Sequence, residues 1–134
     1  MQIKFWGVRG SIPSGSKDTA GVGGNTTCAE IRCGDELIII DTGTGVRNLG
    51  MALMKEMPVK GTILFSHVHW DHIQGFPFFG PFFVPGNEFR IFGGTSLPKT
   101  IGEVLDQQMT PPCFPVKTEL FGAKLTYHDV KPGD

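Results

Sequence analysis

Residues 65–75, FSHVHWDHIQG, hold three of the chain's four histidines within six positions, with an aspartate among them. Imidazole nitrogens and carboxylate oxygens are the donors that zinc and its first-row neighbours prefer. Side chains two residues apart on an extended chain point the same way, so His67 and His69 could grip one metal ion together. Asp71 and His72 could then offer an oxygen and a nitrogen to a second position nearby. The spacing therefore predicts a metal site.

A less specific interpretation of this segment is an incidental polar loop or a tract that binds metal adventitiously. Its position favours a true site, because it follows directly on the apolar run at residues 62–65 and ends at a glycine. The fourth histidine, His128, stands alone in the sequence. A lone histidine is more often solvated or hydrogen-bonded than a metal ligand, and we expect that ordinary role for His128.

The elements that position this segment follow from the pattern of apolar residues. Alternating or continuous apolar runs predict strands, and apolar residues at helical spacing predict helices. The predicted strands are residues 2–8, 27–32, 37–40, 62–65, 88–92 and 124–130, and the predicted helices are residues 46–56 and 100–108. This order of strands and helices indicates a layered α/β domain over residues 1–134.

Asp41, like the histidine segment, comes directly after an apolar strand. Residues 37–40 run into the glycine turn that begins Asp41-Thr42-Gly43, and we expect this strand to be fully buried and parallel to residues 62–65. Sites in α/β sheets lie at the carboxyl ends of the strands. We therefore expect Asp41 beneath the histidines. Capping of the following helix is a second role for it, compatible with the first.

Composition excludes several classes of protein. The formal net charge is −1 at pH 7, which indicates no broad surface for nucleic acid or membranes. No apolar run approaches the roughly 18 residues of a membrane span, and the first residues do not resemble a signal peptide. We expect a cytoplasmic protein. The three cysteines are an odd number and argue against a disulfide framework. Cys28 and Cys33 have four residues between them and no histidine nearby, which is a poor match to a zinc site, so we expect both to be buried as small apolar residues.

Two further segments are candidates for function. Arg9 and Ser11 lie in a loop rich in glycine and serine that could reach an anionic substrate, although a solvated loop is the more ordinary role. Residues 76–86, FPFFGPFFVPG, hold five of the eleven phenylalanines. We expect them to pack under the adjacent helix or to form a surface that meets another subunit, in preference to lining a pocket.

The segment SHVHWDHIQG resembles the H-x-H-x-D-H motif of the metallo-β-lactamase superfamily. LIIIDTGTGVRNLG resembles that superfamily's strand, aspartate, glycine turn and helix. FWGVRGSIP…GGNTTCAEIR and MTPPCFPV resemble a branch of hydrolases near ribonuclease Z and the cyclic-nucleotide phosphodiesterases. The resemblance covers nearly all of the chain. It implies that this α/β chain is the N-terminal half of an αββα sandwich.

The resemblance also implies a role for each residue of the motif. His67 and His69 would bind one metal ion, and Asp71 and His72 a second. Asp71 would also orient the metal-bound water or take its proton, and Asp41 would orient the ligands from below. The implied cofactors are two divalent metal ions, zinc first, with manganese or iron as alternatives. The implied reaction is hydrolysis by metal-bound hydroxide, with a phosphodiester or another small molecule as substrate and thioesters or lactones as alternatives.

The same resemblance predicts a second half with two more histidines and a bridging aspartate. After His72 the chain has only His128, which we do not expect to replace these ligands. We therefore expect residues 1–134 to be a truncated domain with an incomplete site, weak metal binding and no activity alone. An inactive metal-binding half-domain is the alternative function. The sheet face that the second half would cover would be exposed, and we expect self-association through it or through the phenylalanine loop.

Overall fold

The computed structural model describes residues 1–94, 99–131 and 133–134, and its centre is a single six-stranded sheet. Each strand lies beside its neighbours in sequence. Pairing is antiparallel between the first three strands and parallel between the last four. All six predicted strands are confirmed: β1 (Gln2–Gly7), β2 (Cys28–Cys33), β3 (Glu36–Ile40), β4 (Lys60–Phe65), β5 (Glu88–Gly94) and β6 (Lys124–Val130).

The helices of the described residues are short. They are the α-helices α1 (Val46–Leu53), α2 (Trp70–Ile73) and α3 (Ile101–Gln107), and the 3₁₀ turns η1 (Lys17–Thr19), η2 (Phe76–Phe78), η3 (Gly80–Phe83) and η4 (Thr118–Leu120). The helix expected to continue to Glu56 ends at Leu53. It ends there because the N–H groups of Lys55 and Glu56 donate to carbonyls three residues back, which tightens the chain into a turn.

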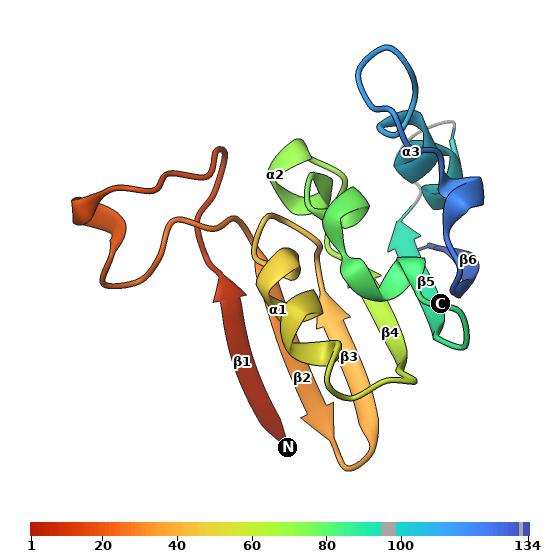
Figure 1. Cartoon of the computed structure of the whole chain (residues 1–134), viewed down its shortest axis with the longest axis horizontal. Coiled ribbons are helices and arrows are strands. Elements are labelled where there is room, and N and C mark those ends of the chain that lie inside the picture. Colours follow the sequence, from red (N-terminus) through yellow and green to blue (C-terminus); the bar gives the residue numbers. More distant parts are fainter. Residues whose placement is uncertain (95–98, 132) are drawn as a thin grey trace.

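The core lies between the sheet and the helices, which cover one of its faces (Figure 1). The strand residues that point to this face alternate along each strand, as a half-covered sheet requires. On this face, Ile39 of β3, Ile63 of β4 and Ile91 of β5 are register partners and lie side by side. All three are fully buried.

The phenylalanine segment packs into this core, as expected. Phe76, Phe79 and Phe82 are fully buried, and the ring of Phe82 lies 4.7 Å from that of Phe76 and 4.8 Å from that of Phe79 between centroids. Gly50 of α1 faces Phe79 so closely that a Cβ on Gly50 would touch the ring. The segment forms the turns η2 and η3 beneath α1, whereas Phe78 and Phe83 point outward.

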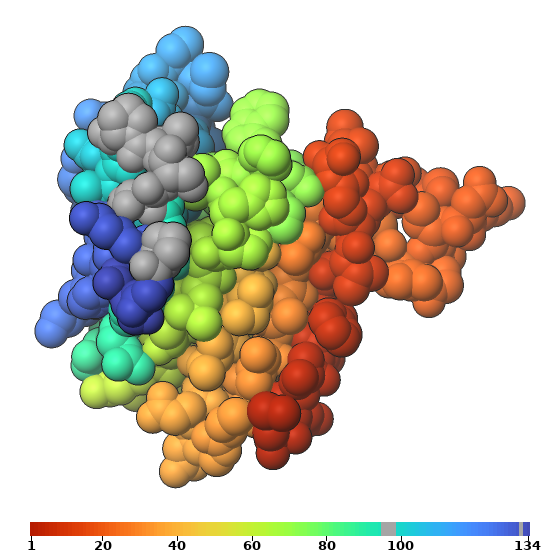
Figure 2. Space-filling view, turned by 180° about the vertical axis from the view of Figure 1, so that it is seen from behind, coloured from red at the N-terminus to blue at the C-terminus, as the bar shows by residue number. Residues whose placement is uncertain are grey.

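The opposite face of the sheet is open to solvent (Figure 2), with apolar side chains on β1 and β3 and charged ones, among them Lys60, Glu88 and Arg90, on β4 and β5. Ile3 and Phe5 of β1 point to it and are 49% and 68% exposed. Ile38 and Ile40 of β3 point the same way and are half-buried. The expectation that β3 is buried on both faces is therefore wrong for this face, because no element of the described residues packs over it.

The two cysteines differ from each other. Cys28 is fully buried, and burial raises the pKa of its thiol well above the ordinary range, with Asp41 and Glu30 adding to the rise. It remains a neutral, small apolar side chain, as expected. Cys33 is exposed at the end of β2, where the chain turns back, so the prediction for Cys33 is wrong.

None of the helices in the described ranges has the length and apolar character needed to cross a lipid bilayer. The expected cytoplasmic location stays a prediction.

Gly75 is the tightest point between two loops at the end of the sheet. A Cβ on Gly75 would collide with the carbonyl of Gly43, and a Cβ on Gly43 would collide with the carbonyl of Asp71. We expect Gly75→Ala to lower the free energy of unfolding by about 1–3 kcal/mol, because backbone atoms cannot yield to the added methyl. Urea denaturation measures this. Gly15→Ala is the control, since a Cβ there meets nothing within 4 Å; equal losses in the two variants would contradict the proposed contact.

Candidate metal centre

The histidine segment begins where β4 ends, beside the turn that follows β3. The N–H of Asp41 donates to the carbonyl of Leu64 (2.9 Å), and the N–H of Thr42 donates to the carbonyl of His72 (2.8 Å). The N–H of Gly75 donates back to the carbonyl of Thr42 (2.8 Å). The turn after β3 is thus held between the end of β4 and α2, at the carboxyl ends of the parallel strands (Figure 1).

Asp41 is the buried centre of this arrangement. It is 1% exposed and has a left-handed backbone, with φ of 59°. Its Oδ1 accepts the N–H of Ser66 (2.8 Å), and its Oδ2 accepts the hydroxyl of Ser66 (2.7 Å). The same Oδ2 lies 2.8 Å from Nδ1 of His72. The expectation that Asp41 lies beneath the histidines agrees with these contacts.

The two pairs of motif side chains that are expected to share an ion each lie close together. The rings of His67 and His69 lie 4.5 Å apart between centroids, and Nε2 of His72 lies 3.5 Å from Oδ2 of Asp71. Two donor atoms, each about 2.1 Å from a tetrahedral zinc ion, would lie roughly 3.4 Å apart. The second pair therefore has the spacing of two ligands of one ion. The ring of His67 also lies 4.0 Å from that of His72, so the pairs adjoin.

These pairs do not amount to an assembled site. Within residues 1–94, 99–131 and 133–134, no group of three or more His, Cys, Asp or Glu side chains is arranged to hold a metal ion. The donor types fit zinc or a neighbouring transition metal, since three imidazoles and a carboxylate are its usual ligands. The metal-binding roles of His67, His69, Asp71 and His72 stay predictions.

The N-terminal loop reaches the cluster through its backbone. The N–H of Ser11 donates to Oδ2 of Asp71 (2.8 Å), and Ser11 adopts a left-handed φ of 70° to do so. This hydrogen bond lowers the pKa of Asp71, and the nearby His72 and His67 lower it further against a rise from desolvation. Arg9 folds back on its own loop, where Nε donates to the carbonyl of Ile12 (2.8 Å). Substrate contacts by Arg9 and Ser11 stay predictions.

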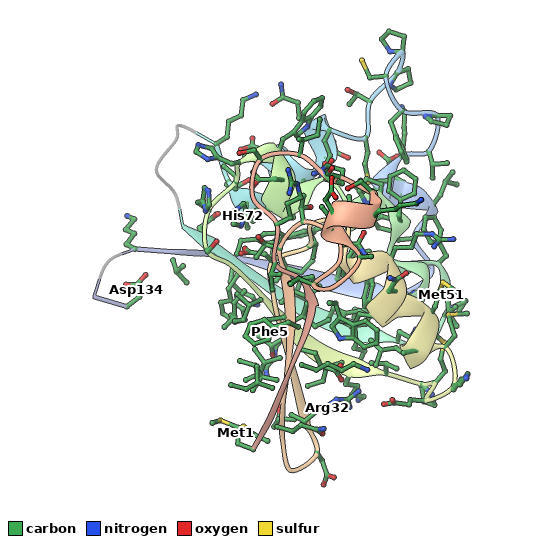
Figure 3. All side chains as sticks on the ribbon, turned by 90° about the vertical axis from the view of Figure 1, so that its left-hand side faces the viewer. Met1, Phe5, Arg32, Met51, His72 and Asp134 are labelled. Carbon is green, nitrogen blue, oxygen red and sulfur yellow. The ribbon has the colours of Figure 1, made fainter. Side chains whose placement is uncertain are left out.

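His128 lies outside the cluster, as expected. Its ring stacks on that of Phe92, with 4.6 Å between centroids and 16° between planes. Both residues are on the open face of the sheet, on β6 and β5, whereas the motif follows β4. Figure 3 places His72 at one end of the sheet and Arg32 at the other.

A threonine pair that residue spacing does not reveal holds the glycine turn in place. The N–H of Thr26 donates to Oγ1 of Thr44 (2.9 Å), and the N–H of Thr44 donates to Oγ1 of Thr26 (2.8 Å). Gln74, which follows the motif, donates to the same Oγ1 of Thr26 (3.3 Å). Ser66 was missed as well, although a hydroxyl residue directly before the first motif histidine was a usable signal.

No protein-family model and no curated protein sequence matches the chain. Three solved structures match its fold. The metallo-β-lactamase fold protein YhfI from Bacillus subtilis is 19% identical, with a TM-score of 0.60 over 98% of this chain and 46% of its own. Human tRNase Z, short form (ELAC1), is 19% identical, with a TM-score of 0.57 over 98% of this chain and 47% of its own. A diphosphatase from the PhnP family is 18% identical, with a TM-score of 0.61 over 96% of this chain and 50% of its own.

The chain has the metallo-β-lactamase fold. It spans about half the length of the three structures that it matches, with shares of 46%, 47% and 50%. These shares confirm the expectation that the chain is about half of a metallo-β-lactamase fold. At these identities the likeness concerns the path of the backbone, and activity is a separate question.

Asp41→Asn tests whether the buried carboxylate holds this end of the metallo-β-lactamase fold together. Asparagine tolerates the left-handed backbone, but it replaces one acceptor oxygen with a donor. A donor on Ser66 or His72 then loses its partner, and we expect the free energy of unfolding to fall by about 1–3 kcal/mol in urea. Asp18→Asn, at an exposed site, is the control. Equal free energies of unfolding in the two variants would show that the Asp41 carboxylate does not stabilise this end of the fold.

Proposed function

We propose that this chain carries part of the metal site of a hydrolase that acts on phosphodiesters. The observation that carries the proposal is the cluster after β4, in which Nε2 of His72 faces the carboxylate of Asp71 while Nδ1 faces the buried Asp41. A carboxylate behind a histidine is the usual way in which proteins orient a metal ligand and fix its tautomer.

The proposed cofactors are two divalent metal ions, with zinc first and manganese or iron as alternatives. His67 and His69 would hold one ion, and Asp71 and His72 the other. A divalent ion, when bound, lowers the pKa of a water molecule toward neutrality and offsets charge on the substrate. Asp71 is suited to work beside it, because the N–H of Ser11 keeps the carboxylate in its ionised form.

A phosphoryl substrate is favoured by two features. Two of the structures with the same fold are named as a tRNase and a diphosphatase. The loop that carries Arg9 is docked at the edge of the cluster through the N–H of Ser11, which would place a cation close to a bound anion.

A second candidate function is metal binding without catalysis. It is favoured because, in the described parts of the chain, no group of three or more His, Cys, Asp or Glu side chains is arranged to hold an ion. Two ligands per ion hold a metal weakly, whereas catalytic zinc sites use three protein ligands and one open position. Further ligands would have to come from outside residues 1–134.

We expect the 134-residue chain to bind zinc weakly and to leave bis-p-nitrophenyl phosphate intact. Titration calorimetry gives the affinity, and release of p-nitrophenol gives the rate. His69→Ala should weaken zinc binding by about tenfold or more, since it removes a ligand. His128→Ala is the matched control and should bind zinc as the parent chain does. Tight stoichiometric zinc with full turnover would contradict the incomplete site.

The reading frame that encodes the chain separates the two candidates. If it continues past Asp134 with further histidines and an aspartate, the longer protein should hydrolyse bis-p-nitrophenyl phosphate. His69→Ala should abolish that activity and His128→Ala should retain it. A longer protein that binds two metal ions but cleaves no phosphodiester would support another substrate class or the non-catalytic candidate.

We also propose that the chain self-associates through the open face of its sheet. Exposed apolar residues on a regular surface favour a partner of the same kind. Phe5→Lys should shift the mass measured by light scattering toward the monomer, because a charge on this face opposes its burial. Met51→Lys is the matched control, since Met51 is 59% exposed on α1, which covers the other face. A monomeric parent chain would contradict this proposal.

A further inference from the structure

We infer that Ser66 is a positioning residue that passes the influence of Asp41 on to His67. Through it, a single buried carboxylate would decide which ring nitrogen carries the hydrogen on two motif histidines. His72 contacts the carboxylate directly and His67 contacts it through the serine hydroxyl. The inference concerns the chain without metal; only its consequence for metal affinity rests on the proposed function.

Three contacts meet at the hydroxyl of Ser66. Its Oγ lies 2.7 Å from Oδ2 of Asp41, 3.1 Å from Nδ1 of His67 and 3.3 Å from Nδ1 of His72. The backbone N–H of Ser66 donates to the other carboxylate oxygen of Asp41 (2.8 Å), so the residue is held at two points. The serine therefore has little freedom to turn its hydroxyl elsewhere.

The single hydrogen of this hydroxyl goes to Asp41. A carboxylate is a stronger acceptor than a neutral imidazole nitrogen, and the contact to Asp41 is the shortest of the three. With its hydrogen engaged there, Oγ can only accept from the rings. Nδ1 of His67, at 3.1 Å, must then carry a hydrogen, since two lone pairs at this distance would repel each other.

The same reasoning places a hydrogen on Nδ1 of His72. This nitrogen lies 2.8 Å from Oδ2 of Asp41, which can only accept. In both rings Nδ1 is then closed to a metal ion, and Nε2 is the nitrogen that remains available. Ser66 thus extends to the first donor pair an orientation that Asp41 gives directly only to the second.

The tautomers can be read without metal or activity. Chemical shifts of ¹⁵N in the histidine rings distinguish hydrogen on Nδ1 from hydrogen on Nε2 when the protein is held well above the ordinary histidine pKa of about 6.5. We expect His67 and His72 to carry hydrogen on Nδ1 in the metal-free chain. Ser66→Ala should shift His67 toward hydrogen on Nε2, the form that free imidazole side chains favour, while His72 keeps its tautomer. Ser66→Thr retains the hydroxyl and should restore His67.

His128 is the internal control, because it stacks on Phe92 and should give the same shifts in every variant. If Ser66→Ala unfolds the chain, the parent and Ser66→Thr still decide the matter, since both must show hydrogen on Nδ1 of His67. Hydrogen on Nε2 of His67 in the parent chain would overturn the inference. So would a tautomer that stays unchanged in a folded Ser66→Ala variant.

Zinc titration then separates this inference from the proposed function. Where the parent chain binds zinc, Ser66→Ala should weaken the affinity by about tenfold and Ser66→Thr should recover it. A chain with the expected tautomers but no affinity for zinc would leave the role of Ser66 intact and contradict the proposed metal site. Equal zinc affinity in the parent and Ser66→Ala would show that the serine orients His67 without any effect on binding.

Discussion

The arrangement around β4 depends on one buried carboxylate. Asp41 is almost inaccessible to solvent, and a buried charge is costly unless its oxygens are fully partnered. Its partners are Ser66 from the end of β4 and His72 from α2. A shift of either element would remove at least one of these hydrogen-bond donors from the buried carboxylate, which costs free energy. The carboxylate therefore fixes the relative position of the strand end, the turn and the short helix.

The sheet brings these partners together by its register. Parallel pairing of β3 and β4 sets Ile40 beside Leu64, so the next residues along both strands leave the sheet at the same edge. The turn after β3 can then pass under α2, but only because Gly43 and Gly75 have no side chain to hold the two backbones apart. Apolar patterning builds the sheet, and two glycines let the polar cluster close over its end.

Much of the fold and part of the candidate site could be predicted from the sequence. Strands and the buried phenylalanines follow from apolar periodicity, and Asp41 follows from its place after an apolar run. The four residues of α2 are too few to show a period, and the contact of Ser11 with Asp71 uses a backbone N–H that no residue type reveals. Cys33 is exposed because β2 ends there, and strand ends are the least predictable part of a pattern.

The proposed donors differ in how firmly neighbouring residues hold them. His72 and Asp71 each have a fixed partner, in Asp41 and in the N–H of Ser11. His69 is exposed at the start of α2, and its ring is placed by contact with the ring of His67. A ligand that is already oriented loses less entropy on binding, so the pair nearest Asp41 is the better prepared of the two. The order imposed by Asp41 thus weakens with distance, from His72 in direct contact with the carboxylate to the exposed His69.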